Sequence, residues 1–224
     1  MFTNDFSPEI LKVDTPFSFD GFKIELPFYD SEKDEEGVLS INETLHFWTL
    51  KKWKSLQDKE KVSNWKVLFF YPADFTFVCP TELKDLADVK KDLDKLEVEV
   101  FPISTDSIYS HKAWVKQELL LKNFKFKMLS DHNLELSKRL GILDIKTWMA
   151  DRATYIVDSN GILRSIEITS GPLGRNSEEL IRKIEALQFI EKNKDMVCPA
   201  RWKKGDKTIK PSLKISWNVF NELN

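Results

Sequence analysis

The sequence predicts an α/β fold in which helices cover a central mixed sheet. Three observations point to it: short apolar runs of strand length, longer stretches with apolar residues at helical spacing, and the alternation of the two along the chain. Of the 224 residues, 42% are hydrophobic and 31% are charged, which supplies a packed core and excludes a disordered chain. One large domain with appendages is the expected organisation.

The first part of the chain is the least regular. Lys23 to Phe28 is predicted to form a short strand, and the acidic run Asp30 to Glu36 is predicted to form a solvated loop. Asn42 to Lys61 fits either a surface helix or a hairpin, and its Trp48 and Trp53 are expected to pack rather than to form a ligand platform.

The predicted elements become clearer from residue 65 onward. The apolar run Lys66 to Tyr71, closed by Pro72, is typical of a strand buried on both faces. Pro80 to Leu96 has leucines at helical spacing and a proline suited to the first turn, so Cys79 is predicted at the start of a helix. The later predicted elements are strand Val98 to Ile103, helix Asp106 to Leu121, strand Phe124 to Leu129, helix Asn133 to Leu140, a hairpin over 154–169 and a helix begun by Asn176. Because right-handed crossovers bring the carboxyl ends of parallel strands to one edge, Cys79 is expected at that edge.

The charge balance favours no polyanionic partner. With 34 Lys and Arg against 36 Asp and Glu, the net charge is -2, and neither nucleic acid nor membrane is an expected partner. The basic run Arg201 to Lys207 is interpreted as a solvated tail or a dimer contact, because Asp206 interrupts it. The N-terminus lacks a signal-peptide pattern, and no apolar run approaches the ~20 residues of a membrane span. We therefore expect a soluble, cytoplasmic protein.

The chain has two cysteines, Cys79 and Cys198, and three histidines, His46, His111 and His132. Two cysteines are too few for a disulfide-stapled scaffold, and the scattered histidines give no metal-ligand spacing. The cysteines are therefore interpreted as thiols. We interpret His111 as a helix residue rather than as a base for Cys79.

Cys79 is the candidate nucleophile. A thiol reacts as its thiolate, and a helix N-terminus together with a neighbouring cation favours that form. Cys79 has the Thr76 hydroxyl three residues before it and the Glu82 carboxylate three residues after it. From the residues alone, a small buried core residue is the alternative interpretation of Cys79.

The segment around Cys79 carries a highly specific resemblance. Phe69-Phe-Tyr-Pro-Ala-Asp-Phe-Thr-Phe-Val-Cys-Pro-Thr-Glu-Leu83 resembles the active-site signature of typical two-cysteine peroxiredoxins of the alkyl hydroperoxide reductase C type. The resemblance extends from about residue 65 to about residue 213. It includes the local matches Ser104-Thr-Asp106, His111-Lys-Ala-Trp114, Asp151-Arg-Ala-Thr154, Ile166-Glu-Ile-Thr169, Gly174-Arg175 and Val197-Cys-Pro-Ala-Arg-Trp202.

This resemblance implies a thioredoxin-like (peroxiredoxin) α/β sandwich with a central mixed sheet and an extended C-terminal tail. It implies that Cys79 is the peroxidatic cysteine, that Pro72 shields it and that Thr76 hydrogen-bonds the peroxide. The implied activity is thiol-dependent reduction of hydrogen peroxide and organic hydroperoxides, in antioxidant defence and redox homeostasis. Neither a metal nor an organic cofactor is implied.

Three charged residues match supporting positions of the family. Arg152 matches the arginine that stabilises the thiolate and the breaking O–O bond, although without the motif a surface salt bridge would be the expected role of Arg152. The resemblance implies that Glu82 and Arg175 are partners of this inner group.

Cys198 follows the last long predicted helix and matches the family's resolving cysteine. The resemblance implies an antiparallel homodimer in which Cys79 forms a disulfide with Cys198 of the partner subunit, and a ring of five such dimers. A dithiol protein, either a thioredoxin or a flavoprotein disulfide reductase, would then reduce the disulfide. A bystander thiol in the tail is the alternative interpretation of Cys198.

The chain is predicted to have three parts. Residues 1–64 form an N-terminal segment with an insertion over about 30–62 that is atypical of the family, 65–192 form the peroxidase core, and 193–224 form the tail with the resolving cysteine. The chain lacks the Gly-Gly-x-Gly segment and the C-terminal Tyr-Phe pair of over-oxidation-sensitive members, which suggests a robust enzyme. A redox-regulated holdase chaperone or a peroxide sensor on the same fold is the alternative function, and a structural module with inert thiols is a third.

Overall fold

The computed structural model describes residues 11–15, 24–41, 47–49 and 65–223. It divides into two compact units, Met1–Arg175 and Asn176–Asn224. Most of the stretch that was predicted to be an insertion lies outside the described residues, so the division into three parts stays a prediction. No helix in the described part of the chain is long and apolar enough to cross a bilayer.

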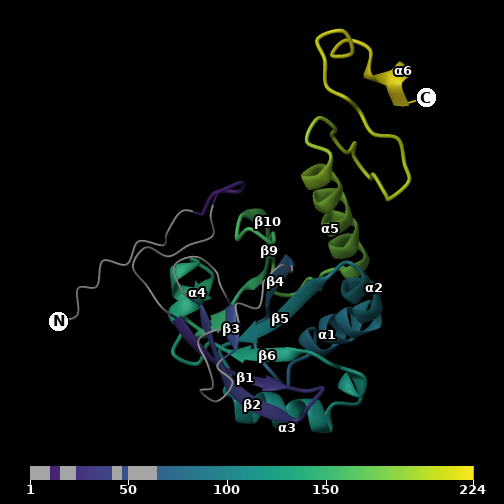
Figure 1. The fold of residues 1–224 in the computed structure, drawn as a ribbon. Coiled ribbons are helices and arrows are strands. Elements are labelled where there is room, and N and C mark those ends of the chain that lie inside the picture. Colours follow the sequence, from purple (N-terminus) through teal and green to yellow (C-terminus); the bar gives the residue numbers. More distant parts are fainter. Residues whose placement is uncertain (1–10, 16–23, 42–46, 50–64, 224) are drawn as a thin grey trace, which may run out of the picture. The chain divides into compact units, whose positions relative to one another are not determined.

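The first unit contains a mixed sheet whose eight described strands lie in the order β10-β9-β4-β5-β6-β1-β2-β3 (Figure 1). The neighbours β4, β5 and β6 are parallel, and the other neighbouring pairs are antiparallel. The strands are β1 (Ile24–Asp30), β2 (Glu35–Ile41), β3 (Phe47–Thr49), β4 (Trp65–Phe70), β5 (Val98–Ser104), β6 (Lys127–Ser130), β9 (Arg152–Val157) and β10 (Leu163–Thr169), and a separate short pair is formed by β7 (Leu143–Asp144) and β8 (Met149–Ala150). The predicted α/β fold with a mixed central sheet is confirmed.

Helices cover both faces of this sheet. Leu68 and Phe70 of β4 belong to one buried cluster together with Leu136 of helix α4, so α4 covers that face. Val67 and Phe69 alternate with them along the strand, point to the other face and are equally buried. In this unit the helical elements are α1 (Cys79–Asp88), α2 (Lys90–Lys95), α3 (Ile108–Gln117), the 3-10 turn η1 (Leu119–Leu121) and α4 (Glu135–Arg139).

Three predicted elements differ from the structure by more than their end residues. The helix predicted over Asp106 to Leu121 ends at Gln117, because Glu118 is extended (φ -80°, ψ 116°), and the 3-10 turn η1 follows. The helix predicted over Pro80 to Leu96 is two helices, because the chain leaves helical geometry at Val89 (φ -94°, ψ 6°), where Asp88 and a β-branched residue of low helix propensity meet. The acidic run predicted as a loop is only partly a loop, since Glu35 and Glu36 begin β2 and pair with Asp30 and Tyr29 of β1.

The carboxyl ends of β4, β5 and β6 meet at one edge of the sheet, as predicted, because these strands are parallel. The loop from β4 leads along this edge to Cys79 at the start of α1. Strand β9 runs antiparallel to β4 and pairs Ala153 with Phe70, so Arg152, its first residue, lies at the same edge. The topology therefore brings Cys79 and Arg152 together from positions 73 residues apart.

The second unit contains helix α5 (Ser177–Lys192), the tail and the short helix α6 (Val219–Leu223). As predicted, Asn176 caps α5: its side chain accepts hydrogen bonds from the N–H groups of Glu178 and Glu179. Within this unit Trp202 of the tail packs on Phe189 of α5, with ring centroids 5.1 Å apart. The first part of the tail is thus folded back onto its own helix.

Candidate active site

Cys79 is the first residue of α1 and its side chain is fully buried. The first turn is closed by the carbonyl of Val78, which accepts from the N–H of Thr81 at 3.0 Å and from the N–H of Glu82 at 3.2 Å. Pro80 suits this turn because it has no N–H to satisfy. The structure thus places the thiol at a helix N-terminus, where partial positive charge collects.

The guanidinium of Arg152 contacts the sulfur of Cys79. Arg152 Nη1 donates to Cys79 Sγ at 3.4 Å and also forms an ion pair with Glu82 Oε2. The Nε of Arg152 donates to the carbonyl of Gly171 at 2.6 Å, which fixes the plane of the guanidinium. The Arg152 side chain is 4% exposed, so it is not a surface salt bridge. Cys79 is therefore a buried thiol with a cation in direct contact, unlike an ordinary core cysteine.

Glu82 and Arg175 support this contact. The carboxylate of Glu82 accepts from the backbone N–H of Arg175 at 2.9 Å and from its Nε at 2.8 Å. Arg175 Nη1 donates to the carbonyl of Ala153 at 2.9 Å and to Thr154 Oγ1 at 3.0 Å, and its guanidinium carbon lies 3.4 Å from the centre of the Phe69 ring. Burial lowers the pKa of Arg175.

The loop between β4 and α1 carries Pro72 and Thr76, which are both partly buried. The Thr76 hydroxyl donates to the carbonyl of Ala73 at 2.8 Å. Its hydrogen is therefore engaged within the loop, and its oxygen lone pairs are the groups that a ligand can use. The Phe77 side chain of the same loop is 94% exposed.

A buried polar cluster that lies beneath this loop was not predicted from the sequence. The Tyr71 hydroxyl donates to Asp74 Oδ1 at 2.7 Å, and the ring Nδ1 of His111 lies 2.9 Å from Asp74 Oδ2. His111 is a helix residue, as predicted, but its side chain is directed to the active-site loop. The only indication in the sequence was the local match to the family around His111 and Trp114, and that match did not predict a contact with Asp74.

Cys198 belongs to the second unit. Its Sγ lies 3.9 Å from the carbonyl oxygen of Ala186 in α5, and the side chain is partly exposed. Burial raises the pKa of Cys198, and the positive charge of Arg182 opposes this rise. Arg182 is itself held by an ion pair with Glu179 and by a hydrogen bond to the carbonyl of Trp202.

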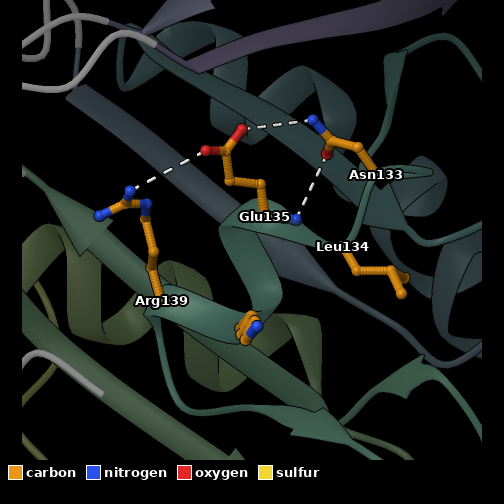
Figure 2. A pocket seen from close by; sticks show the side chains of 5 residues that line it. Asn133, Leu134, Glu135 and Arg139 are labelled. Carbon is orange, nitrogen blue, oxygen red and sulfur yellow. Dashed lines mark hydrogen bonds and ion pairs between the residues drawn. The ribbon is translucent and has the colours of Figure 1, made fainter. Parts of the chain in front are cut away.

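A shallow pocket lies at helix α4 (Figure 2). Figure 2 shows Glu135 between Asn133 and Arg139, with the Asn133 amide 3.3 Å and the Arg139 guanidinium 3.9 Å from its carboxylate. The Glu135 carboxylate thus contacts both neighbours, and these groups are not the residues that surround Cys79. Among the described residues, no group of three or more His, Cys, Asp or Glu side chains is arranged to hold a metal ion.

Comparisons with known proteins show which family this chain is similar to. Residues 44–166 match the AhpC/TSA family, and residues 186–221 match the C-terminal domain of 1-Cys peroxiredoxin. Alkyl hydroperoxide reductase C of Escherichia coli strain K12 is 42% identical over 160 residues, which are 71% of this chain and 86% of that protein.

Solved structures show the same similarity. The crystal structure of Enterococcus faecalis AhpC is 37% identical, with a TM-score of 0.69, over 84% of this chain and 100% of that chain. The reduced 2-Cys peroxiredoxin of Plasmodium vivax is 29% identical, with a TM-score of 0.73, over 90% of this chain and 94% of that chain. The fold and the thiol site define the class of protein as a peroxiredoxin, an enzyme that reduces peroxides with a cysteine thiol. The chain belongs to the AhpC/TSA family.

Proposed function

We propose that Cys79 is the peroxidatic cysteine of an enzyme that reduces hydrogen peroxide and organic hydroperoxides. The observation that carries the proposal is the contact of Arg152 Nη1 with Cys79 Sγ, 3.4 Å apart in a buried site at a helix N-terminus. A fixed guanidinium and the start of a helix both favour the thiolate over the thiol. The thiolate is the form that attacks a peroxide.

The chemical step breaks the O–O bond. The Cys79 thiolate attacks one peroxide oxygen, and the electron pair of the O–O bond leaves with the other oxygen, which takes up a proton and departs as water or an alcohol. The sulfur is oxidised to sulfenic acid. Because negative charge develops on the departing oxygen, the Arg152 guanidinium stabilises the transition state more than the ground state. Thr76 accepts the peroxide hydrogen through its free lone pairs, and Pro72 shields the thiol.

The second step uses the other thiol. Cys198 of the partner subunit attacks the sulfenic sulfur, a disulfide forms and water leaves. Since Cys79 is fully buried in the first turn of α1, this turn must open before the two sulfurs can meet. A dithiol protein, a thioredoxin or a flavoprotein disulfide reductase, then restores both thiols.

The intersubunit disulfide requires a homo-oligomer. Strand β10 is an edge strand of the described sheet. Leu163 at its start exchanges backbone hydrogen bonds with Asp14 and Thr15, so the outer backbone groups of the later residues of β10 are the ones that can pair with a second copy of the chain. We propose an antiparallel homodimer, and a ring of five dimers as its larger assembly, in the cytoplasm.

A non-reducing gel of peroxide-treated protein tests the two-thiol cycle. Wild type is expected to form a covalent dimer that disappears with dithiothreitol. Cys79→Ser and Cys198→Ser are each expected to stay monomeric on the gel, and Cys79→Ser is also expected to lose peroxide consumption.

A covalent dimer that persists in Cys79→Ser would overturn this proposal. Protection of unfolded clients is measured on the same samples, because a holdase does not need the thiol. The comparisons do not favour the holdase function. Client protection in Cys79→Ser, together with no peroxidase activity in wild type, would favour the holdase function over the peroxidase function.

A further inference from the structure

Asp74, in the loop from β4 to α1, is held by hydrogen bonds to Tyr71 of the same loop and to His111 and Asp106 of other segments. Its carboxylate accepts the Tyr71 hydroxyl at 2.7 Å and lies 2.9 Å from His111 Nδ1 of α3. Its backbone N–H donates to Asp106 Oδ2 at 2.8 Å. Tyr71 and His111 are fully buried, and Asp74 nearly so. The parallel strands explain the meeting, since these residues all follow carboxyl ends at the same sheet edge.

The hydrogen-bond partners of His111 define where its protons lie. Its Nε2 is 3.2 Å from the carbonyl oxygen of Leu129, which has no hydrogen to donate, so Nε2 carries one. The contact between Nδ1 and Asp74 then needs one further proton, held by either partner. Either form joins the imidazole to the carboxylate, and both ring nitrogens are satisfied. A satisfied buried network of this kind rigidifies the segment that it holds.

The pinned residue controls a peptide group that touches Thr76. The N–H of the Ala73–Asp74 peptide donates to Asp106, and its carbonyl accepts the Thr76 hydroxyl at 2.8 Å. A peptide unit is planar, so fixing the N–H also fixes the direction of the carbonyl. Asp106 is itself held by the Ser104 hydroxyl at 3.0 Å.

We propose that His111 is a positioning residue of the peroxidase reaction. Through Asp74 it holds the Ala73–Asp74 peptide, which engages the hydroxyl hydrogen of Thr76 and leaves the Thr76 oxygen as an acceptor for the O–H of the hydroperoxide. His111 acts through Asp74 and not by contact with the thiol. This inference rests on the proposed role of Cys79 and Thr76.

A matched pair of substitutions separates the two contacts of His111. The amide nitrogen of Asn lies about where Nδ1 lies and keeps a donor to Asp74, whereas the longer Gln side chain reaches toward Leu129 and loses Asp74. Both replace the ring by a smaller amide, so the packing loss is similar. The measurement is the second-order rate constant for oxidation of Cys79 by hydrogen peroxide, from single-turnover tryptophan fluorescence, with the Tm of each variant beside it.

We expect His111→Gln to be about tenfold slower than wild type, because small misplacement of a binding group lowers rates by one to two powers of ten. His111→Asn is expected to stay near the wild-type rate at a similar Tm. In a Thr76→Val background the effect of His111→Gln is expected to vanish, because His111 acts through Thr76. A general loss of stability would instead slow both backgrounds equally.

Equal rates for His111→Asn and His111→Gln, or an undiminished effect of His111→Gln beside Thr76→Val, would overturn the inference. If the His111 variants do not fold, Asp106→Asn and Asp106→Ala test the same peptide, since Asn keeps an acceptor for the N–H of Asp74 and Ala does not. Equal rates in that pair also overturn it. Failure of the proposed function would give a different result, because wild type itself would then show no peroxide reduction that depends on Cys79.

Discussion

Glu82 accepts three hydrogen bonds from Arg175, from the backbone N–H at 2.9 Å, from Nε at 2.8 Å and from Nη2 at 3.3 Å. The same carboxylate forms an ion pair with Arg152, which contacts Cys79. One buried anion therefore compensates two buried cations. The charge of the active site is fixed by Glu82 as much as by the arginine on the sulfur.

Glu82→Gln is expected to destabilise the protein. Removing the carboxylate charge takes away the buried anion that two buried guanidiniums share, and breaking a buried ion pair typically costs about 3–5 kcal/mol. Urea unfolding of the reduced protein measures the change. Glu178→Gln, an exposed acid at the start of α5, is the control, with an expected change below about 1 kcal/mol. An unfolding midpoint equal to wild type in Glu82→Gln would contradict the compensating role.

Arg152→Gln is expected to slow oxidation of Cys79 by peroxide about a hundredfold or more, as loss of one fixed transition-state donor does elsewhere. The oxidation rate of Arg152→Lys is expected to lie between the rates of wild type and Arg152→Gln. One ammonium cannot replace the planar guanidinium that reaches Gly171, Glu82 and Cys79 together. Stopped-flow fluorescence measures both rates. Arg164→Gln, which alters an ion pair with Asp158 instead, is the control. Wild-type speed in Arg152→Gln would remove Arg152 from the mechanism.

The thiol of Cys198 is expected to ionise at a higher pH than an ordinary cysteine thiol. Burial raises its pKa above the ordinary value of 9.0, so less thiolate is present at a given pH and alkylation is slower. In a Cys79→Ser variant the rate of alkylation by iodoacetamide should rise with pH to a midpoint above 9.0. Arg182→Gln removes the opposing charge and should move this midpoint higher. A midpoint below 9.0, or one that Arg182→Gln leaves in place, would contradict this account of the thiol.

Over-oxidation of Cys79 is expected to need a large excess of peroxide. The resemblance links sensitivity to two sequence elements that are not found between Glu118 and Leu129 or over residues 215–224, so we expect Cys79 to spend little time as a sulfenic acid. Over-oxidation is measured by mass spectrometry, as the fraction of Cys79 in the sulfinic form after graded peroxide treatment in the presence of reductant. Inactivation already at a small molar excess of peroxide would show that the inference from the missing elements is wrong.

The sequence predicted the mixed sheet, the sheet edge and the start of α1, because these follow from local apolar patterns and from the handedness of crossovers. It did not predict the break at Val89, since the leucine spacing continues through it. It also missed the contact of His111 with Asp74. That pairing joins residues 37 positions apart, and only the meeting of parallel strand ends makes it visible.

The resemblance selected Arg152, Glu82 and Arg175, which the residues alone would not have separated from surface ion pairs. What no pattern contained was their order of contact: Arg175 holds Glu82, and Glu82 holds Arg152. This order depends on the side-chain directions of Arg152 at the start of β9, Glu82 in the first turn of α1 and Arg175 just before α5, which are set by packing and not by spacing.

Cys79 is completely buried whereas Cys198 is partly exposed, so the two thiols can be distinguished by reagent size. A small hydroperoxide and a bulky maleimide polymer have very different access to a sulfur that is covered by its own helix. Mass-tagging with such a polymer therefore marks Cys198 in the native population, and it marks Cys79 only in molecules whose first turn is unwound. The tagged fraction of Cys79 then becomes a direct gauge of how often this helix end frays.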